Sequence, residues 1–335
     1  MKIAFFEVEE WEKVYLQQKL AGNELQFFTE PFTSENLHEV KDVEIISTFI
    51  YSSVTKEMLE KLPNLRMITT RSTGYDHIDV ATCIKHKNVT VCNVPHYGTR
   101  TVAEHTFALI LALSRKIFKS VERTRHGDFD HHELTGFDLY GKTIGIIGLG
   151  DIGRSVLHIA KGFGMRVVSI SRHPDEALAR RLGVTFLDMN ELFAVSDIVT
   201  LHVPYTKATR HMVNKRTIKK FKKGSLLINT ARGGLIETEA ILYGLEKGIL
   251  AGVGLDVLEG EDIIQEERQI LSKHFLEHAN IKTLYFDHVL MKQENVVITP
   301  HNAFNSTEAL HLILDVTVAN IKDFIADKPQ NTVSM

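Results

Sequence analysis

The sequence is poor in the features that mark disordered, secreted or nucleic-acid-binding proteins. Its 335 residues include only 7 Pro and 21 Gly, and no low-complexity tract stands out, which excludes a disordered chain. Lys and Arg number 39 against 42 Asp and Glu, a net charge of −3, so nothing favours a nucleic acid or an anionic membrane as partner. Two cysteines, Cys83 and Cys92, are too few for a disulfide framework and predict reduced thiols.

Long hydrophobic runs are also missing. The longest, from Phe107 to Leu113, is far shorter than the ~20 residues that span a bilayer. The apolar N-terminal residues meet Glu7 at once, which indicates a first strand and not a signal peptide. We therefore expect a cytoplasmic protein, and its length suggests about two domains.

What the sequence does contain is a regular alternation of short β-branched runs with helical periodicity, which is typical of parallel sheets. The first series predicts helices over 54–61 and 78–87, a long helix over about 101–125, and strands over 3–6, 25–28, 43–49, 66–70 and 89–94. The second predicts strands over 143–147, 166–171, 198–203, 225–229, 252–257 and 296–299, with helices over 152–163, 175–182, 215–220, 237–247 and 306–325. Region 262–294 has no clear period. The predicted fold class is α/β, with two doubly wound parallel-sheet units.

A glycine motif follows the first strand of the second series. Residues 148–153 read Gly-Leu-Gly-Asp-Ile-Gly, a G-x-G-x-x-G that directly opens a predicted helix. Gly148 would make the tight turn, Gly150 would let a pyrophosphate approach the backbone, and Gly153 would let helix and strand pack closely. The anion would then lie at a helix N-terminus. This context favours dinucleotide binding over a glycine-rich turn without a ligand.

A second phosphate-binding pattern is a coincidence. Residues 136–143 fit G-x-x-x-x-G-K-[ST], but a P-loop connects a strand to a following helix, and this segment leads into a strand.

The end of the next strand should select the cofactor. An acidic residue about twenty positions after the glycines would bind the ribose 2′-hydroxyl of NAD. Here Ser171 stands in that place and Arg172 follows it. A guanidinium suits a 2′-phosphate, which favours NADP(H) or the use of both cofactors, while a solvated Arg172 beside a hydroxyl-binding Ser171 is the alternative.

Three residue types suited to acid–base chemistry follow three other predicted strands. They are Arg232 in Asn-Thr-Ala-Arg-Gly-Gly, Glu261 in Asp-Val-Leu-Glu-Gly-Glu, and His301 in Thr-Pro-His-Asn. Ligands of open α/β sheets collect outside the carboxyl ends of the strands. Each residue alone would more often be a surface charge or a structural histidine, but their shared position predicts one site. We assign no metal site.

Several motifs together give the chain a resemblance that covers nearly its whole length. They are residues 71–79 (Arg-Ser-Thr-Gly-Tyr-Asp-His-Ile-Asp), 93–97 (Asn-Val-Pro-His-Tyr), 102–106 (Val-Ala-Glu-His-Thr), the glycine loop, 201–204 (Leu-His-Val-Pro), 229–233 and 299–301. The sequence resembles the D-isomer-specific 2-hydroxyacid dehydrogenase family, most closely its D-lactate dehydrogenase branch. The departure is Ser171, where NAD-using members have an acid.

The resemblance implies a role for each matching residue. Arg232 would bind the substrate carboxylate, His301 would be the catalytic acid–base, and Glu261 would be its carboxylate partner. Other substrate contacts would be Thr73, Gly74, Tyr97 and Phe304. Cofactor contacts would be Gly148, Gly150, Asp151, Ile152, Gly153, Ser171, Arg172, Val203, Pro204, Thr209, Thr230, Ala231 and Asp256.

The resemblance also implies the domain organisation and the reaction. Residues 1–100 and 300–335 would form a flavodoxin-like substrate domain, and residues 101–299 a Rossmann-type cofactor domain that pairs in a homodimer. The activity would be hydride transfer between NAD(P)H and a small 2-keto acid, first of all pyruvate to D-lactate. Alternatives are glyoxylate or hydroxyphenylpyruvate reduction, phosphoglycerate oxidation, and a dinucleotide-sensing corepressor without enzymatic activity.

Overall fold

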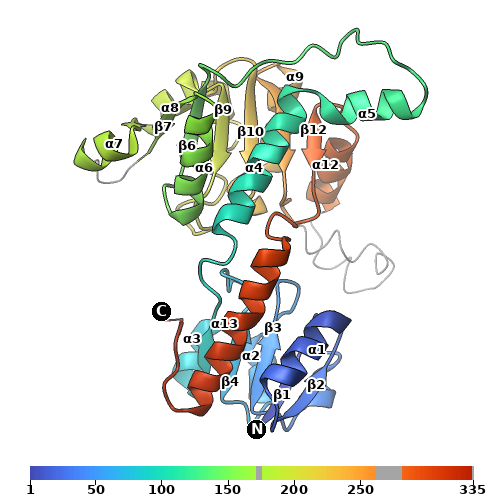
Figure 1. Cartoon of the computed structure of the whole chain (residues 1–335), viewed down its shortest axis with the longest axis vertical. Coiled ribbons are helices and arrows are strands. Elements are labelled where there is room, and N and C mark those ends of the chain that lie inside the picture. Colours follow the sequence, from blue (N-terminus) through green and yellow to red (C-terminus); the bar gives the residue numbers. More distant parts are fainter. Residues whose placement is uncertain (171–175, 261–280, 334–335) are drawn as a thin grey trace. The chain divides into compact units, whose positions relative to one another are not determined.

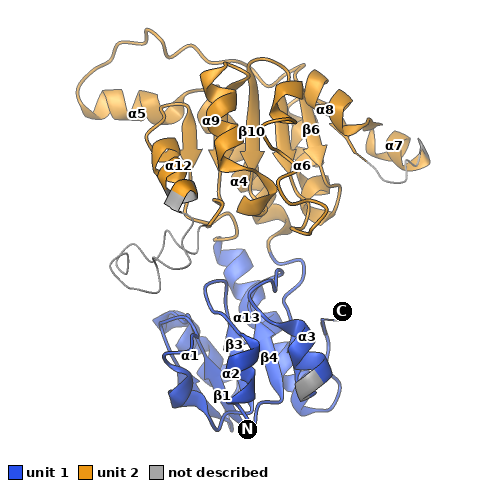
Figure 2. Ribbon diagram, turned by 180° about the vertical axis from the view of Figure 1, so that it is seen from behind, with its two compact units in different colours: residues 1–97, 306–335 blue, residues 98–305 orange. Residues whose placement is uncertain are grey.

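A computed structural model describes residues 1–170, 176–260 and 281–333 (Figure 1). The chain forms two compact units. Unit 1 comprises Met1–Tyr97 and Ser306–Met335, and unit 2 comprises Gly98–Asn305 (Figure 2). The chain passes from unit 1 to unit 2 after Tyr97 and returns to unit 1 after Asn305. Ser171, Arg172 and Glu261 lie outside the described residues.

Unit 1 is built on a parallel sheet with strand order β2-β1-β3-β4-β5. The strands are β1 (Lys2–Phe5), β2 (Glu24–Phe27), β3 (Ile45–Thr48), β4 (Met67–Thr70) and β5 (Thr90–Cys92). Every residue of β3 and β4 is buried, as expected for strands covered on both faces. Figures 1 and 2 show α1 (Glu10–Lys19) and α13 (Thr307–Ile325) on one face, and α2 (Lys56–Glu60) and α3 (Val80–Thr82) on the other.

Unit 2 is built on a second parallel sheet, with strand order β12-β11-β10-β9-β6-β7-β8. The strands are β6 (Thr143–Ile147), β7 (Arg166–Ser169), β8 (Thr185–Phe186), β9 (Ile198–Leu201), β10 (Ser225–Asn229), β11 (Leu250–Leu255) and β12 (Val296–Ile298). The chain runs outward from β6 through β7 and β8, then returns to β9 and continues the other way. The switch point of this doubly wound sheet therefore lies between β6 and β9, as the α/β prediction requires.

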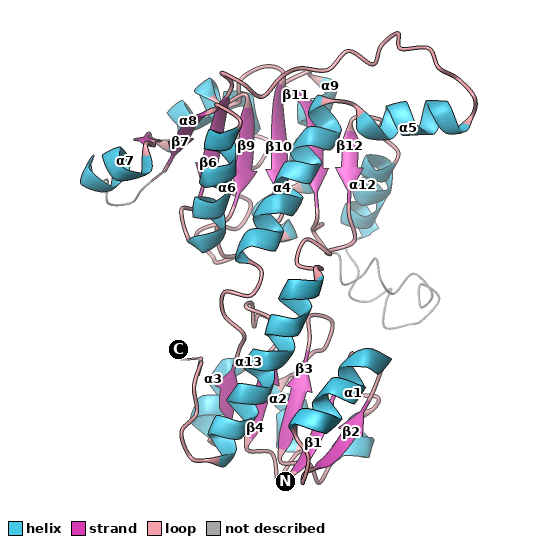
Figure 3. Ribbon diagram, in the orientation of Figure 1, coloured by secondary structure: helices cyan, strands magenta, loops and turns pink. Residues whose placement is uncertain are grey.

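Helices cover both faces of this sheet (Figure 3). On one face α4 (Thr99–Ser114) packs against α6 (Asp151–Gly162), and their apolar residues share a core with β6 and β10. The other face is covered by α8 (Met189–Val195), α9 (Thr238–Glu246) and α12 (Ile281–Met291). Helix α7 (Glu176–Leu182) follows β7. Segment 136–143, which fits the P-loop pattern, leads into strand β6 and not into a helix, as expected for a coincidental match.

The single long helix predicted over 101–125 is wrong. The chain forms α4 and a separate α5 (Ile117–Arg125), because Lys116 takes a left-handed conformation with φ +51°. The last buried residue of α4 is Ser114 and no residue of α5 is buried, so there is no continuous core to extend one helix through both segments. The prediction also omitted α1, β8 and α8. Helix α8 does begin with a local signal, the capping box formed by Asp188 and Glu191.

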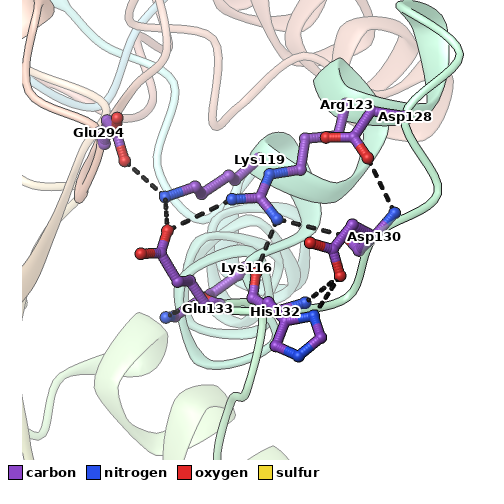
Figure 4. Close-up of polar contacts among 8 residues, drawn as sticks. All are labelled: Lys116, Lys119, Arg123, Asp128, Asp130, His132, Glu133 and Glu294. Carbon is purple, nitrogen blue, oxygen red and sulfur yellow. Dashed lines mark hydrogen bonds and ion pairs between the residues drawn. The ribbon is translucent and has the colours of Figure 1, made fainter.

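Charged side chains hold α5 in place (Figure 4). Lys119 Nζ lies 2.8 Å from Glu294, just before β12, and 3.6 Å from Glu133. Arg123 also pairs with Glu133 and donates to the backbone carbonyls of Asp130 and His132. Exposed ion pairs of this kind contribute little each, so α5 is attached mainly through polar contacts while its apolar residues stay exposed.

Candidate active site

The candidate site of unit 2 lies along one edge of its sheet. Loops following β6, β9, β10, β11 and β12 all start at the carboxyl ends of parallel, adjacent strands. This is where open α/β sheets bind their ligands. Four motifs found in the sequence occupy these loops: the glycine loop, residues 201–204, the turn containing Arg232, and the turn containing His301.

The glycine loop has the geometry that a pyrophosphate requires. Gly148 has φ +104°, and a side chain there would also overlap the carbonyl oxygen of His202. A side chain at Gly153 would overlap the carbonyl of Gly148, so helix α6 packs directly onto the loop. Gly150 instead faces open space, and as the N-cap of α6 it offers no side chain to bind the first backbone N–H groups. These groups fit the phosphates of a dinucleotide.

The loop after β9 borders the glycine loop. Val203 lies against Gly148, and the Thr209 hydroxyl donates to the Pro204 carbonyl at 2.7 Å, which closes the following turn. His202 is partly buried, with its Nε2 2.9 Å from Thr200 Oγ1. Burial of its ring lowers the pKa of His202 to about 3, so this imidazole is neutral at neutral pH.

The turn after β10 presents Arg232. The fully buried amide of Asn229 shapes it: its Oδ1 accepts from the Ala231 N–H at 3.0 Å, and its Nδ2 donates to the Arg232 carbonyl at 2.9 Å. Arg232 is partly buried, and Nη1 donates to the Ala231 carbonyl. Thr230 is buried, with its hydroxyl 3.1 Å from that of Thr106 on α4.

The turn after β12 carries His301 in a left-handed conformation, φ +50°, which few non-glycine residues adopt. Asp256 holds this turn. Its carboxylate is 1% exposed and accepts from the backbone N–H groups of Asn302 at 3.0 Å and Ala303 at 2.8 Å, and from the Thr299 hydroxyl. The His301 N–H donates to the Asp256 and Thr299 carbonyls. The buried carboxylate of Asp256 thus holds the backbone of the turn that carries the His301 imidazole.

A second histidine joins this network. His105 of α4 places Nε2 3.0 Å from Thr299 Oγ1 and 3.5 Å from the Asp256 carboxylate. His105 belongs to the 102–106 motif, and no role was predicted for it. The available signal was its position in a helix whose apolar residues face the sheet, which turns a polar residue of the same face toward the strand ends.

Unit 1 holds three of the expected substrate contacts. The Thr73 hydroxyl donates to the Val94 carbonyl at 2.9 Å, and the Ser72 hydroxyl donates to the Gly74 carbonyl at 2.6 Å, so the 72–74 turn is well defined. Arg71, 1% exposed, precedes it and donates to the Phe6 and Glu7 carbonyls. The third contact, Tyr97, is partly buried, as is Phe304 of unit 2.

The remaining expectations concern metals, membranes and thiols. Among the described residues, no three His, Cys, Asp or Glu side chains gather to hold a metal ion. None of the described helices is both long and apolar enough to cross a membrane. Cys83 and Cys92 are free and buried, and burial raises the pKa of each thiol to about 12. Neither is poised to act as a nucleophile.

An acidic side chain, Asp287, lies next to the start of α9, the helix that follows the Arg232 turn. Asp287 of α12 is fully buried, with Oδ1 3.3 Å from the Thr238 hydroxyl. Burial raises its pKa to about 7, and the negative charge of Glu259 acts in the same direction. The folded protein therefore holds a proton on Asp287 over a pH range, from about 4 to 7, in which the unfolded chain has released it. Stability falls as pH rises through that range.

We expect Asp287→Asn to remove this pH dependence, because the amide carries no charge to desolvate. The melting temperature of the variant relative to the wild type should rise between pH 5 and pH 8, by roughly 2–4 °C for each kcal/mol of relieved desolvation. Differential scanning fluorimetry over that range measures it. Asp138→Asn, at an exposed site, is the matched control. A constant difference between Asp287→Asn and the wild type would contradict the assignment.

The chain is similar to known proteins over most of its length. The family described as D-isomer specific 2-hydroxyacid dehydrogenase, NAD binding domain, matches residues 107–303. The chain is 34% identical over 328 residues to the D-lactate dehydrogenase of Escherichia coli K12, covering 96% of each sequence. It is 32% identical over 326 residues to the glyoxylate reductase of Pyrococcus furiosus, covering 95% of the chain and 86% of the relative.

A solved structure is similar over the same extent. The D-lactate dehydrogenase of Aquifex aeolicus, complexed with NAD and lactic acid, matches with a TM-score of 0.86 and 36% identity, covering 97% of this chain and 96% of that one.

Proposed function

Because the chain belongs to the D-isomer-specific 2-hydroxyacid dehydrogenase family, we propose that it reduces pyruvate to D-lactate with a nicotinamide dinucleotide. Family membership makes it an NAD-dependent oxidoreductase with a Rossmann-type cofactor domain. The choice of substrate is the proposal. Its main support is the convergence at one sheet edge of a glycine loop, an arginine turn and a rigidly held histidine, together with similarity to enzymes named for D-lactate.

The reaction needs two things from the protein besides the cofactor. When bound, the reduced nicotinamide supplies a hydride to the keto carbon. Arg232 offers a planar fork that matches the substrate carboxylate and selects 2-keto acids over simple ketones. A protonated His301 donates its proton to the carbonyl oxygen as negative charge develops there. The product is the 2-hydroxy acid, and the histidine is left neutral.

Three further assignments stay predictions within this mechanism. Glu261 would favour the protonated imidazole of His301 and orient its ring. The backbone of Thr73 and Gly74 in unit 1 would add donors to the substrate carboxylate, which makes unit 1 the substrate domain. Side chains of Tyr97 and Phe304 would line the pocket for the substituent on the keto carbon.

We expect NADH oxidation with pyruvate, and a 10²–10⁴-fold lower kcat in His301→Asn, because the general acid is lost. Asparagine tolerates the left-handed backbone, so the turn should survive the substitution. NADH affinity, measured by fluorescence titration, should be unchanged and serves as the control. An unchanged kcat would exclude His301 as the acid.

A panel of 2-keto acids then separates pyruvate from the alternatives. Glyoxylate is the second candidate, since a glyoxylate reductase is 32% identical to this chain. Hydroxyphenylpyruvate and 3-phosphohydroxypyruvate test the other sibling activities. A higher kcat/KM for any of these would replace pyruvate as the substrate. No turnover with any keto acid, alongside tight dinucleotide binding, would favour the sensing corepressor.

We propose that the enzyme uses NADP(H) as well as NAD(H), because Ser171 and Arg172 stand where an acid would repel a 2′-phosphate. Arg172→Ala should raise the KM for NADPH several-fold more than the KM for NADH. Arg181→Ala, which removes an equal charge from the exposed surface of α7, is the matched control. Equal effects of Arg172→Ala on both cofactors would leave Arg172 without a role in selectivity.

We also propose that the protein is a homodimer formed through unit 2. The observation in support is α5, a nine-residue helix with no buried residue and with Ile117, Phe118 and Val121 each at least 40% exposed. A helix this short gains its stability mainly from tertiary packing, which a second copy would supply.

That the protein acts in the cytoplasm stays a prediction.

Phe118→Glu should therefore shift the protein from dimer to monomer in sedimentation velocity, because it places a charge in the apolar contact. Val195→Glu, at an exposed apolar position of α8, should leave the dimer intact. A monomeric wild type, or a dimer that Phe118→Glu leaves unchanged, would overturn the proposed contact.

A further inference from the structure

Two side chains without an assigned role, His211 and Glu259, form a contact beside the Arg232 turn. His211 lies in the loop after β9, and Glu259 lies in the loop after β11. His211 Nε2 is 2.5 Å from Glu259 Oε1, and both side chains are largely shielded, with 30% and 22% exposed. The contact thus spans β10, whose carboxyl end carries Arg232.

The turn that carries Arg232 is in contact with both loops, the one after β9 and the one after β11. A side chain at Gly233 would overlap the carbonyl group of Leu258, and one at Gly234 would lie 2.7 Å from the ring of Tyr205. The two residues that follow Arg232 are therefore in direct contact with the loop after β11 on one side and the loop after β9 on the other. Any movement of either loop changes where the Arg232 backbone stands.

Backbone hydrogen bonds join the first of these loops to the turn. The His211 N–H donates to the Gly234 carbonyl at 2.9 Å, and the Val213 N–H donates to the Leu235 carbonyl at 3.2 Å. The Glu237 N–H returns to the Val213 carbonyl at 2.9 Å, so the segments run side by side. His211 has φ +48°, an unfavourable conformation that its neighbours must hold.

The Glu259 carboxylate also binds the chain that follows Arg232. While Oε1 contacts His211, Oε2 accepts from the Thr238 N–H at 3.1 Å and from its hydroxyl at 3.2 Å. Thr238 is the first residue of α9, a few residues after Arg232. One carboxylate therefore ties together the loop after β9, the loop after β11 and the chain leaving the Arg232 turn.

We propose that His211 and Glu259 are positioning residues for Arg232: their pair closes the ring of contacts that holds the guanidinium in place for the substrate carboxylate. The inference rests on the proposed function, since it assigns the pair to binding of the 2-keto acid. A fork that binds a carboxylate through two parallel hydrogen bonds loses affinity when it is displaced by a fraction of an ångström to an ångström. Neither residue is among the cofactor contacts expected from the sequence.

His211→Leu tests the proposal, with His211→Gln as the conservative variant, because the glutamine amide can still donate to Glu259. His211→Leu should raise the KM for the keto acid about tenfold and weaken oxamate binding equally, with kcat changed less and NADH affinity unchanged. His211→Gln should restore most of the affinity. Glu259→Gln should resemble His211→Leu, since one amide oxygen replaces two acceptors. His158→Leu, at an exposed position of α6, is the matched control.

A double-mutant cycle shows whether the effect passes through Arg232. In an Arg232→Gln background the guanidinium is gone, so adding His211→Leu should not raise the KM further. The proposal would be overturned if His211→Leu weakened keto-acid binding equally with and without Arg232. It would also be overturned by an unchanged KM in His211→Leu, or by equal losses of keto-acid affinity in His211→Leu and His211→Gln. Melting temperatures identify a variant that fails to fold, and Glu259→Gln then decides. Lack of wild-type turnover would refute the proposed function itself, whereas normal wild-type turnover with any of these contrary results refutes only the role of the pair.

Discussion

The buried carboxylate of Asp256 is the interaction on which the site in unit 2 depends. Taking a carboxylate out of water is costly unless donors replace the lost hydration, and here two backbone N–H groups and a hydroxyl of a single turn do so. The turn cannot move away without leaving a buried charge unsatisfied. This constraint explains how His301 is kept in a backbone conformation that it would otherwise rarely adopt.

The residues after β11 connect the site in both directions across the sheet. Asp256 reaches toward β12 and holds the His301 turn, whereas Glu259, three residues later, reaches past β10 to His211 and to the start of α9. Because β11 lies between β12 and β10, this one loop contacts the supports of both proposed catalytic groups. The proposed proton donor and the proposed carboxylate-binding arginine are thereby supported by the same loop, as a reaction that uses both at once would require.

The switch point explains why the glycine loop faces the rest of the site. Gly148 after β6 meets the carbonyl of His202 after β9, and a side chain there would separate the two loops. The sheet edge at which we expect the dinucleotide phosphates therefore continues directly into the loop that leads to His211.

Periodicity predicted the elements that have strong apolar patterns and missed those that do not. Most strands of both sheets contain β-branched residues, and every strand except β8 was predicted within about two residues of its bounds. Strand β8 has only two residues and no pattern to detect. Helices α4 and α5 were merged because no proline or glycine separates them, and the break at Lys116 results from the end of the core contact. Helix α8 was missed although Asp188 and Glu191 mark its start.

The sequence alone predicted the fold class, the family and the glycine loop with its mechanism. It also led to the choice of Arg232, Glu261 and His301 as candidate site residues. Each of these predictions depends on short spacings or on a pattern along the chain. Only the tertiary structure revealed the contacts of His105 with Thr299 and of His211 with Glu259, which join residues 194 and 48 positions apart. Such contacts depend on which strands become neighbours in the sheet. Strand order is set by packing of the whole unit, and no local run of residues encodes it.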